Sequence, residues 1–430
     1  MRKPLTPNPS PRKRGEGSRF GDRQLVLVAL FTAAAVVVAG QSPCSAADDA
    51  PLCRGPDPLA DTIGPKVVVL EYDHGDVSPW IEFFTFDSRH HPKLVRLRRE
   101  YKLDGIVAGC ETDLKRALAL KEWVSGALKF GTPAEDVFSD WSAVALLRRA
   151  HEGQVVWCGQ AAMVFQQACW SLDIPARYIE CGRPENPACH FTTEVFLREA
   201  DKWAVVDPTP LDDFNLYYTV GGVPQSALEM HRHVVEGTMD RVVEVHPERS
   251  HPVKSEKSPA WAFYYLRWLT RCDVVTHTPR YNHLEDTFDK RWHTVGWIDE
   301  KTVPWEASRH AAWFIRKERL SAWRTSDPEV VTWKPTDRVR ILLCPGPGKR
   351  IFGHLWTGDG ELDHYRIRLD GGAWEDVPKK NTRVWSGKMF GWGPGRFSIE
   401  AVPGLHRVEV RVARRDGSTG PPSHVKFRIE

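Results

Sequence analysis

The sequence predicts an α+β fold, with a helix packed on an antiparallel sheet and an all-β part toward the C-terminus. Apolar residues keep to one helical face from Gly159 to about Leu172. Two alternating strands follow, His190–Leu197 and Lys202–Asp207, joined by the polar turn Arg198–Asp201. After residue 336 the character changes to short alternating segments, separated by turns rich in Gly, Pro and Asp.

The N-terminal segment has the pattern of an export signal. Residues 1–24 are basic and rich in proline, and Leu25–Ala39 is an apolar run without a charge. This run is shorter than the roughly 20 residues that a transmembrane helix needs, and small residues follow it. We therefore expect a signal peptide cut after Ala46 or Ala47, and a secreted or periplasmic protein. A membrane-anchored protein with an uncleaved signal is the alternative.

Strands and helices are predicted between this signal and the central helix. Val67–Tyr72 and Ile81–Phe86 are expected as strands, separated by the turn Asp73–Asp76. A helical period runs from Thr112, the expected N-cap, to about Phe130. A shorter helix is expected over Trp141–Ala150.

The composition argues against a nucleic-acid partner. Lysine and arginine total 59 against 56 aspartate and glutamate, which gives a formal net charge of +3. The chain has 18 tryptophans. Tryptophan can line sugar-binding surfaces, but it also fills cores and interfaces.

The helix that begins near Gly159 carries Cys158 at its N-terminus. There the thiol faces the positive end of the helix dipole and the free N–H groups of the first turn. Both favour the thiolate, which is the reactive form. Cysteine is also common as a small buried hydrophobic residue, so Cys158 alone indicates little.

The hairpin after this helix can bring His190 and Asp207 together. His190 and Thr192 share one face of the first strand. If either pairs directly with Asp207, the His190 and Asp207 side chains lie on the same face, whereas a slip of one residue separates them. Cys158, His190 and Asp207 then supply a nucleophile, a base and a residue that orients the base. The alternatives are a core histidine and a turn at Asp207-Pro208 that only ends the strand.

Residues 158–209 resemble the transglutaminase-like superfamily of papain-type cysteine enzymes. The resemblance rests on ordered motifs at close spacing, and it extends weakly to a strand-then-helix pattern in Arg99–Gly131. Many members carry an aromatic residue two positions after the histidine, where this chain has Thr192, so we expect a different wall around the substrate. The motifs are Cys158-Gly159, Leu172-Asp173-Ile174-Pro175-Ala176-Arg177, His190 with Glu194-Val195, Trp203 and Asp207-Pro208-Thr209.

The resemblance implies a papain-like transglutaminase core, in which the active-site helix packs on an antiparallel sheet. It also implies an oxyanion donor besides the Cys158 backbone N–H, and related enzymes recruit a tryptophan or glutamine upstream. Trp141 and Gln154 are the candidates. We interpret Glu194 as structural, in an ion pair with Arg177.

The predicted reaction is attack of Cys158 on an amide carbonyl to form a thioester, with His190 as base and Asp207 as orienter. Resolution by water gives a peptidase or amidase; resolution by an amine gives a crosslinking protein-glutamine gamma-glutamyltransferase. We favour hydrolysis, because water is the default acceptor unless a site excludes it. The alternative from another class is an inactive binding or scaffold protein. We expect a protein or peptide substrate and no cofactor, and the oligomeric state stays open.

The histidines after residue 230 include His231, His233, His246 and His251. Their spacing matches no established metal-binding pattern such as His-Glu-x-x-His. We therefore expect no metal site.

Nine cysteines are present, and Cys44 leaves with the predicted signal. Cys181 and Cys189 flank a turn-rich loop that leads directly into His190. A disulfide between them would fix the loop beside the base. Two buried thiols are the alternative.

The segment from residue 336 onward predicts an immunoglobulin-like β-sandwich. We expect it to serve as a spacer or cap. The alternative is contact with polysaccharide or cell wall through exposed Trp356, Trp385 or Trp392. The expected strands are Arg338–Leu343, Tyr365–Leu369, Arg396–Ala401, His406–Ala413 and Val425–Ile429.

The length of 430 residues suggests two to four domains. Trp261–Leu269 is dense in aromatic residues, and we expect it to pack a helix onto the core, with a substrate-cleft wall as the alternative. We divide the chain into a signal peptide (1–47), an N-terminal strand-containing segment (48–105), the catalytic core (106–220), an aromatic-rich accessory segment (221–335) and the β-sandwich (336–430).

Overall fold

Every residue described by the computed structural model lies within Arg54–Glu430. The predicted signal peptide, residues 1–47, lies outside the described residues and stays a prediction. Within the described ranges, no helix combines the length and the apolarity that crossing a bilayer requires. The described residues are 65–74, 77, 85–86, 89–132, 142–184, 186–253, 256–269, 271–272, 294–297, 324–346, 349–378 and 395–430.

A ten-stranded sheet forms the centre of the region that carries the helices, which confirms the α+β class. Most neighbouring strands are antiparallel, and the short pair β12–β13 is parallel. Strand β7 (Val223–Pro224) pairs with β6 beside the main path. The strand order is β13 (Arg324–Thr325), β12 (Thr294–Trp297), β10 (Tyr265–Leu269), β3 (Ala176–Arg183), β4 (Asn186–Leu197), β5 (Lys202–Pro208), β6 (Asn215–Val220), β8 (Val243–Val245) and β9 (Ser250–Pro252).

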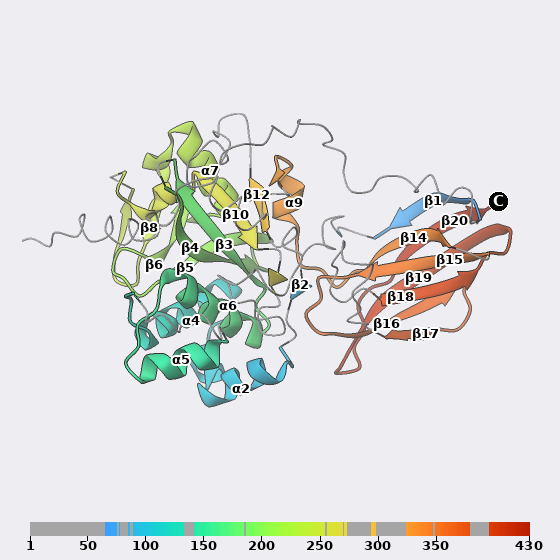
Figure 1. The fold of residues 1–430 in the computed structure, drawn as a ribbon, viewed down its shortest axis with the longest axis horizontal. Coiled ribbons are helices and arrows are strands. Elements are labelled where there is room, and N and C mark those ends of the chain that lie inside the picture. The colour runs from blue at the N-terminus through green and yellow to red at the C-terminus, as the bar shows by residue number, and fades with distance from the viewer. Residues whose placement is uncertain are drawn as a thin grey trace, which may run out of the picture. The chain divides into compact units, whose positions relative to one another are not determined.

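Helices cover both faces of this sheet (Figure 1). Alternate strand residues enter two separate hydrophobic cores: Tyr178 and Val206 lie in one, and their neighbours Ile179 and Val205 lie in the other. Since successive strand residues point to opposite faces, each face of the sheet has its own core. The first core contains α2 (Pro92–Glu100), α3 (Leu103–Ile106), α4 (Asp113–Ala127), α5 (Ala143–His151) and α6 (Cys158–Ser171), and the second contains α7 (Ala227–Glu236).

Helix α6 is the most deeply buried helix of this region. The predicted helix from Gly159 to about Leu172 is confirmed, with its start one residue earlier, at Cys158. Every residue from Gly159 to Ser171 is buried. The helix therefore lacks the exposed polar face that the predicted amphipathic pattern requires. It is enclosed by the sheet and by its neighbouring helices, and small residues such as Ala161 and Ala162 allow that close packing.

The helices before α6 match the prediction in part. The N-cap at Thr112 is confirmed, because its Oγ1 accepts a hydrogen bond from the Lys115 N–H at 3.2 Å. Helix α5 begins at Ala143, while Trp141 lies outside the described residues. The strand expected early in Arg99–Gly131 is wrong: α2 ends at Glu100 and the short helix α3 follows.

The aromatic run Trp261–Leu269 does not form the helix that we expected. Residues Pro259–Ala262 form a short 3₁₀ helix, and β10 follows as a strand of the central sheet. Phe263 and Trp268 lie in the core with α7. The dense aromatic pattern thus reflects a strand within a large sheet rather than a helical face.

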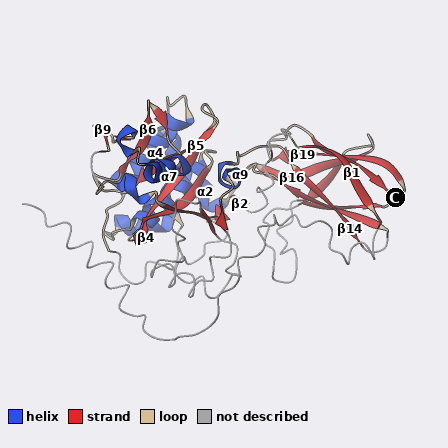
Figure 2. Cartoon of the chain, turned by 90° about the horizontal axis from the view of Figure 1, so that it is seen from above, coloured by secondary structure: helices blue, strands red, loops and turns tan. Residues whose placement is uncertain are grey.

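From β14 onward, the regular elements of the described residues are all strands (Figure 2). Two antiparallel sheets share one hydrophobic core, which confirms the predicted all-β character; the immunoglobulin-like assignment stays a prediction. Trp356 is half-buried and packs against a cluster that includes Trp203 and Trp333, so it lacks the exposure that the polysaccharide alternative assigns to it, while Trp385 and Trp392 lie outside the described residues. One sheet has the order β1 (Val67–Asp73), β20 (Ser423–Ile429), β19 (Gly404–Arg414), β16 (Leu362–Leu369) and β17 (Glu375–Pro378), and the other has β14 (Arg340–Gly346), β15 (Arg350–Trp356) and β18 (Gly395–Glu400).

Several pairings join segments that are distant in the sequence. Strand β1, predicted over Val67–Tyr72, pairs with the last strand of the chain, with Val67 opposite Ile429. Strands from residues 221–335 continue the central sheet beyond β3 and β6. Of the strand predicted over Ile81–Phe86, only β2 (Thr85–Phe86) is described, and it pairs with β11 (Arg271–Cys272).

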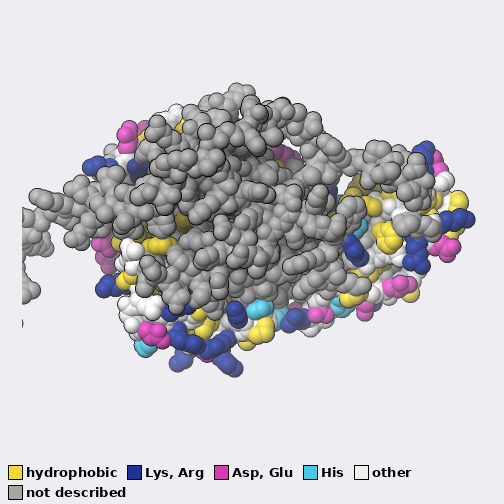
Figure 3. Space-filling view, viewed as in Figure 1, with side chains coloured by type: hydrophobic (Ala, Val, Ile, Leu, Met, Phe, Trp, Pro, Cys, Tyr) yellow, Lys and Arg dark blue, Asp and Glu magenta, His cyan; other side chains and the backbone are white. Residues whose placement is uncertain are grey.

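Basic side chains gather over α2 and α5 on the face shown in Figure 3. The last turn of α2 contains Arg98 and Arg99, and the last turn of α5 contains further arginines. Arg96 and Arg98 form ion pairs with Glu100 and Asp104. These carboxylates offset part of the charge, in keeping with the near-balanced composition.

Candidate active site

His190 and Asp207 lie on neighbouring strands, β4 and β5. The ladder pairs Thr193 with Val206, so the same register carries Thr192 to the position opposite Asp207, one of the two registers that we predicted. His190 Nε2 lies 2.5 Å from Asp207 Oδ2, and both side chains are buried. The hairpin therefore brings the predicted base and its predicted orienter into direct contact.

The two oxygens of Asp207 have separate partners. Oδ2 contacts the His190 imidazole, and Oδ1 accepts a hydrogen bond from the Thr209 backbone N–H at 2.9 Å. The carboxylate thus closes a local turn over Pro208 while it points at the ring. The Phe214 ring packs 4.7 Å from the His190 ring, centroid to centroid. These contacts fix both the carboxylate and the plane of the imidazole.

Cys158 is the first residue of α6, is half-buried and forms a side-chain hydrogen bond with His190. Because Nε2 of His190 forms a hydrogen bond with Asp207, Nδ1 is the ring nitrogen that can interact with the Cys158 thiol. The structure therefore brings Cys158, His190 and Asp207 together in the order that the sequence predicts. Their catalytic roles are taken up as a proposal below.

The electrostatics of the site favour a protonated imidazole. Burial acts to lower the pKa of His190, but the Asp207 carboxylate and then Cys158 outweigh burial and raise that pKa to about 10. An imidazolium beside a thiol favours the thiolate form. The arrangement can therefore hold a thiolate–imidazolium pair.

Gly159 allows the start of α6 to approach the sheet. A Cβ atom at this position would lie 2.5 Å from Tyr178 Oη and 3.5 Å from the Phe191 ring. No side chain fits there without displacing Tyr178. The Cys-Gly pair of the motif thus has a physical reason: the residue after the thiol must leave room for β3 and β4.

A buried ion pair supports the hairpin from beneath. Arg177 contacts Glu194 Oε2 at 2.5 Å, which confirms the predicted pair. Glu194 also accepts hydrogen bonds from Trp268 Nε1 at 2.9 Å and from the Ala227 backbone N–H at 2.6 Å. The Arg177 guanidinium stacks over the Trp203 ring at 4.1 Å. Local sequence patterns do not link Trp268 or Ala227 to Glu194, because their segments are distant from the motif.

The oxyanion candidates have no contact with Cys158 among the described residues. Gln154 has an exposed side chain in the turn after α5, and Trp141 lies outside the described residues. The first-turn N–H groups of α6 remain as donors beside Cys158. The tryptophan and glutamine assignments stay predictions.

The predicted Cys181–Cys189 bridge also stays a prediction, since the Cys189 side chain lies outside the described residues. Cys181 is buried, stands opposite His190 in the β3–β4 ladder, and its Sγ contacts the His190 carbonyl oxygen at 3.6 Å. Cys181 therefore contacts the backbone of His190, whereas Cys158 interacts with its side chain.

A second cluster of titratable groups lies in the hairpin β8–β9. Potential ligand atoms of Glu244, His246 and His251 all lie within 4.8 Å of one another. The sequence predicts no metal here, because its spacing follows no established pattern. The two strands of the hairpin are short, and only their pairing brings the three side chains together.

Comparison with known proteins agrees with the motif. Residues 101–208 match the family model described as Transglutaminase-like superfamily, so this part of the chain is similar to that superfamily. The match covers the hairpin and all three residues Cys158, His190 and Asp207. No curated protein matches the chain.

Solved structures that match include one described as "a Putative Cysteine Protease from Cytophaga hutchinsonii", at 20% identity, a TM-score of 0.24 and coverage of 36% of this chain and 46% of that one. Another is the red sea bream transglutaminase, at 11% identity, a TM-score of 0.26 and coverage of 86% of this chain and 62% of that one. The chain thus spans less than two thirds of either relative.

Proposed function

We propose that this protein is a thiol enzyme that cleaves an amide bond in a protein or peptide through a Cys158 thioester. The observation that carries the proposal is the continuous set of contacts from the Cys158 thiol through the His190 imidazole to the Asp207 carboxylate. Its position in the region that matches the transglutaminase-like family model supports the same chemistry.

In the first half of the reaction, the Cys158 thiolate attacks the carbonyl carbon of the amide. Backbone N–H groups at the start of α6 are the groups available to stabilise the developing oxyanion. His190 then donates its proton to the leaving amine, the carbon–nitrogen bond breaks, and a thioester remains.

In the second half, water replaces the amine. Neutral His190 accepts a proton from the water, and the resulting hydroxide attacks the thioester carbonyl. Collapse of this intermediate breaks the carbon–sulfur bond and returns the thiolate and the imidazolium. Asp207 keeps the Nε2–H bond of His190 fixed throughout, so that Nδ1 points at the reacting atoms.

An amine acceptor would instead form a new amide, and the enzyme would be a protein-glutamine gamma-glutamyltransferase. The same contacts serve both reactions, because only the second nucleophile differs. Hydrolysis is the reaction that we propose. We also propose that the protein is exported to the periplasm or the medium, and this rests on the N-terminal sequence pattern alone. An inactive scaffold is the remaining alternative.

The experiment uses the purified full chain with a library of glutamine-containing peptides, in the absence and presence of a labelled primary amine. Hydrolysis predicts peptide cleavage or ammonia release that needs no amine. Incorporation of label with little hydrolysis would identify the crosslinking alternative. A protein that matches Cys158→Ala in every assay, and that forms no acyl-enzyme in mass spectra, would overturn the enzyme proposal.

A further inference from the structure

The hairpin β8–β9 places three metal-ligating side chains on one face. Glu244 stands directly opposite His251 in the ladder, so their side chains share a face. His246 lies two residues after Glu244 and therefore shares that face as well. The turn is closed by a hydrogen bond from the His246 N–H to the Arg249 carbonyl oxygen at 2.8 Å. The pattern Glu-x-His-x4-His thus becomes a compact group only through the hairpin.

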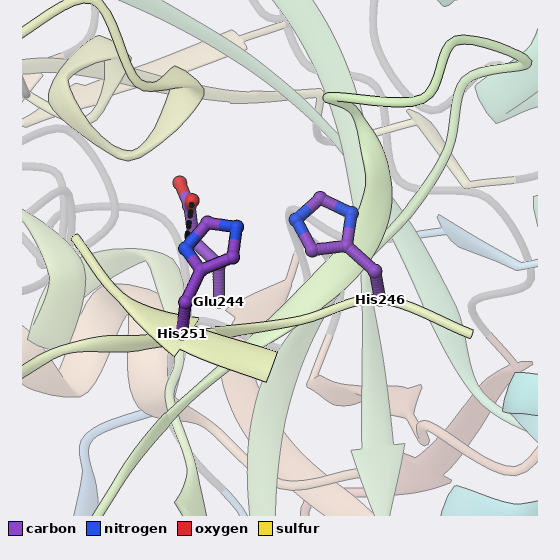
Figure 4. A group of neighbouring side chains, drawn as sticks. All are labelled: Glu244, His246 and His251. Atoms are coloured by element: carbon purple, nitrogen blue, oxygen red, sulfur yellow. Dashed lines mark ion pairs between the residues drawn. The ribbon is translucent and has the colours of Figure 1, made fainter. Parts of the chain in front are cut away.

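The three side chains converge, as Figure 4 shows. Their potential ligand atoms lie within 4.8 Å of one another. Glu244 is 4% exposed and His246 is 8% exposed, while His251 is half-buried. The two imidazole rings lie 5.4 Å apart, centroid to centroid. The group is therefore largely closed to solvent, with access past His251.

Contacts within the protein satisfy this group only in part. His246 Nδ1 is buried and has no hydrogen-bond partner among the described residues. His251 Nδ1 lies 3.4 Å from the Pro252 carbonyl oxygen, and its distance of 3.6 Å from Glu244 Oε2 is longer than a hydrogen bond. A buried nitrogen with a free lone pair, beside a carboxylate oxygen with no close donor, is the state that a cation would complete.

The carboxylate of Glu244 is held in one orientation. The Ser258 hydroxyl donates a hydrogen bond to Glu244 Oε1 and so orients the carboxylate, leaving Oε2 toward His251.

We propose that Glu244, His246 and His251 form a binding site for a divalent transition-metal ion, with Zn²⁺ as its occupant. Two imidazole nitrogens and one carboxylate oxygen are a donor set that suits Zn²⁺, and they leave a further position for water. Ca²⁺ and Mg²⁺ prefer oxygen ligands and do not suit it. The ion would fix β9 to β8 at the edge of the sheet that carries Asp207.

The test is a zinc titration of the full chain, purified without a polyhistidine tag, in competition with a chromogenic chelator. Cys158 with His190 could itself bind Zn²⁺, so all proteins carry Cys158→Ala. We expect a single equivalent to bind in this parent protein. His251→Ala, Glu244→Gln and His246→Ala should each weaken binding by at least about tenfold. His151→Ala, which removes an exposed histidine at the end of α5, should not.

His251→Ala is the decisive variant, because His251 is half-buried and its removal should leave the fold intact; circular dichroism of each variant checks this. Co²⁺ provides an independent probe: the parent should show visible d–d bands without a sulfur-to-metal charge-transfer band. The proposal is overturned if the parent binds no Zn²⁺ in competition, or if folded His251→Ala binds it as tightly as the parent. Neither outcome depends on enzyme activity, so the site can stand or fall apart from the thiol chemistry.

Discussion

Asp207 is held to His190 by one oxygen and to the chain by the other. The Oδ2 atom lies 2.5 Å from His190 Nε2, and Oδ1 accepts the Thr209 N–H at 2.9 Å. This geometry assigns Nε2 of the His190 ring to Asp207 and leaves Nδ1 as the nitrogen that can contact Cys158. The consequence is that Asp207 acts on the reaction only through the orientation and charge of His190.

Replacement of Asp207 by asparagine should therefore slow turnover without removing the nucleophile. An amide at this position can keep the turn but cannot stabilise the imidazolium, and we expect kcat to fall by about 10²- to 10⁴-fold. Steady-state kinetics measure it, with Asp240→Asn, at an exposed position, as the control. An Asp207→Asn enzyme with normal kcat would show that the contact has no catalytic role.

The stability of the protein should depend on pH through the same pair. The pKa of His190 is raised from 6.5 to about 10, so its stabilising contribution is complete below about pH 6.5 and is lost as the pH rises through about 10. We expect the free energy of unfolding to fall across that window by on the order of a few kcal/mol. Urea unfolding at a series of pH values should show this fall in the wild type and little of it in Asp207→Asn. Parallel pH profiles for the two proteins would contradict the prediction.

Local sequence patterns were sufficient for the elements that carry the candidate site. The start of α6 was predicted within one residue, because a run of small residues after Cys158 marks a closely packed helix. The β4–β5 alternation left two registers open, since both put His190 and Asp207 on one face, and only the ladder through Thr193 and Val206 distinguishes them.

Contacts between distant segments could not be predicted in this way. The pairing of β1 with β20 joins Val67 to Ile429 and leaves no local signal. Strands β8 and β9 have three residues each, too short for a visible alternation. Trp268 was misassigned to a helix because an aromatic-rich run fits a buried strand equally well.

Gly159→Ala should damage the site by overpacking. The new Cβ atom would lie 2.5 Å from Tyr178 Oη, and we expect a loss of stability of about 1–3 kcal/mol together with lower activity. Tyr178→Phe removes the clashing oxygen, so the double variant should recover much of the loss. Urea unfolding of the two single variants and the double variant gives the coupling energy. Strictly additive effects would mean that the clash is relieved elsewhere.

Glu194→Gln should destabilise the fold far more than loss of a surface carboxylate. Arg177 and Glu194 are 1% and 0% exposed, so the substitution leaves a buried guanidinium without its counter-charge, at a cost of about 3–5 kcal/mol. The control is Glu100→Gln, which breaks the solvent-exposed pair with Arg96 and should cost far less, because water screens this pair. Equal losses for the two variants would show that the buried pair contributes no more than the exposed one.

The thiols of the folded protein should differ sharply in reactivity toward iodoacetamide. Cys158 is half-buried beside the His190 imidazolium, whereas Cys169 of the same helix is 0% exposed and burial raises its pKa well above the ordinary value. We expect Cys158 to be alkylated at mildly acidic pH, ahead of Cys110, a second half-buried thiol that serves as the internal reference, and long before Cys169. Peptide mapping by mass spectrometry gives the rate at each position.

The histidine variant separates an activated thiol from one that is merely accessible. His190→Ala removes the positive partner of the thiolate, so labelling of Cys158 should slow toward the rate of Cys110, while the rate at Cys110 itself stays unchanged. Asp207→Asn should give an intermediate rate at Cys158, because the imidazole stays in place but loses the carboxylate that stabilises its protonated form. If Cys158 labels no faster than Cys110 in the wild type and His190→Ala changes neither rate, no ion pair exists at the start of α6. The scaffold alternative would then be the better account of the protein.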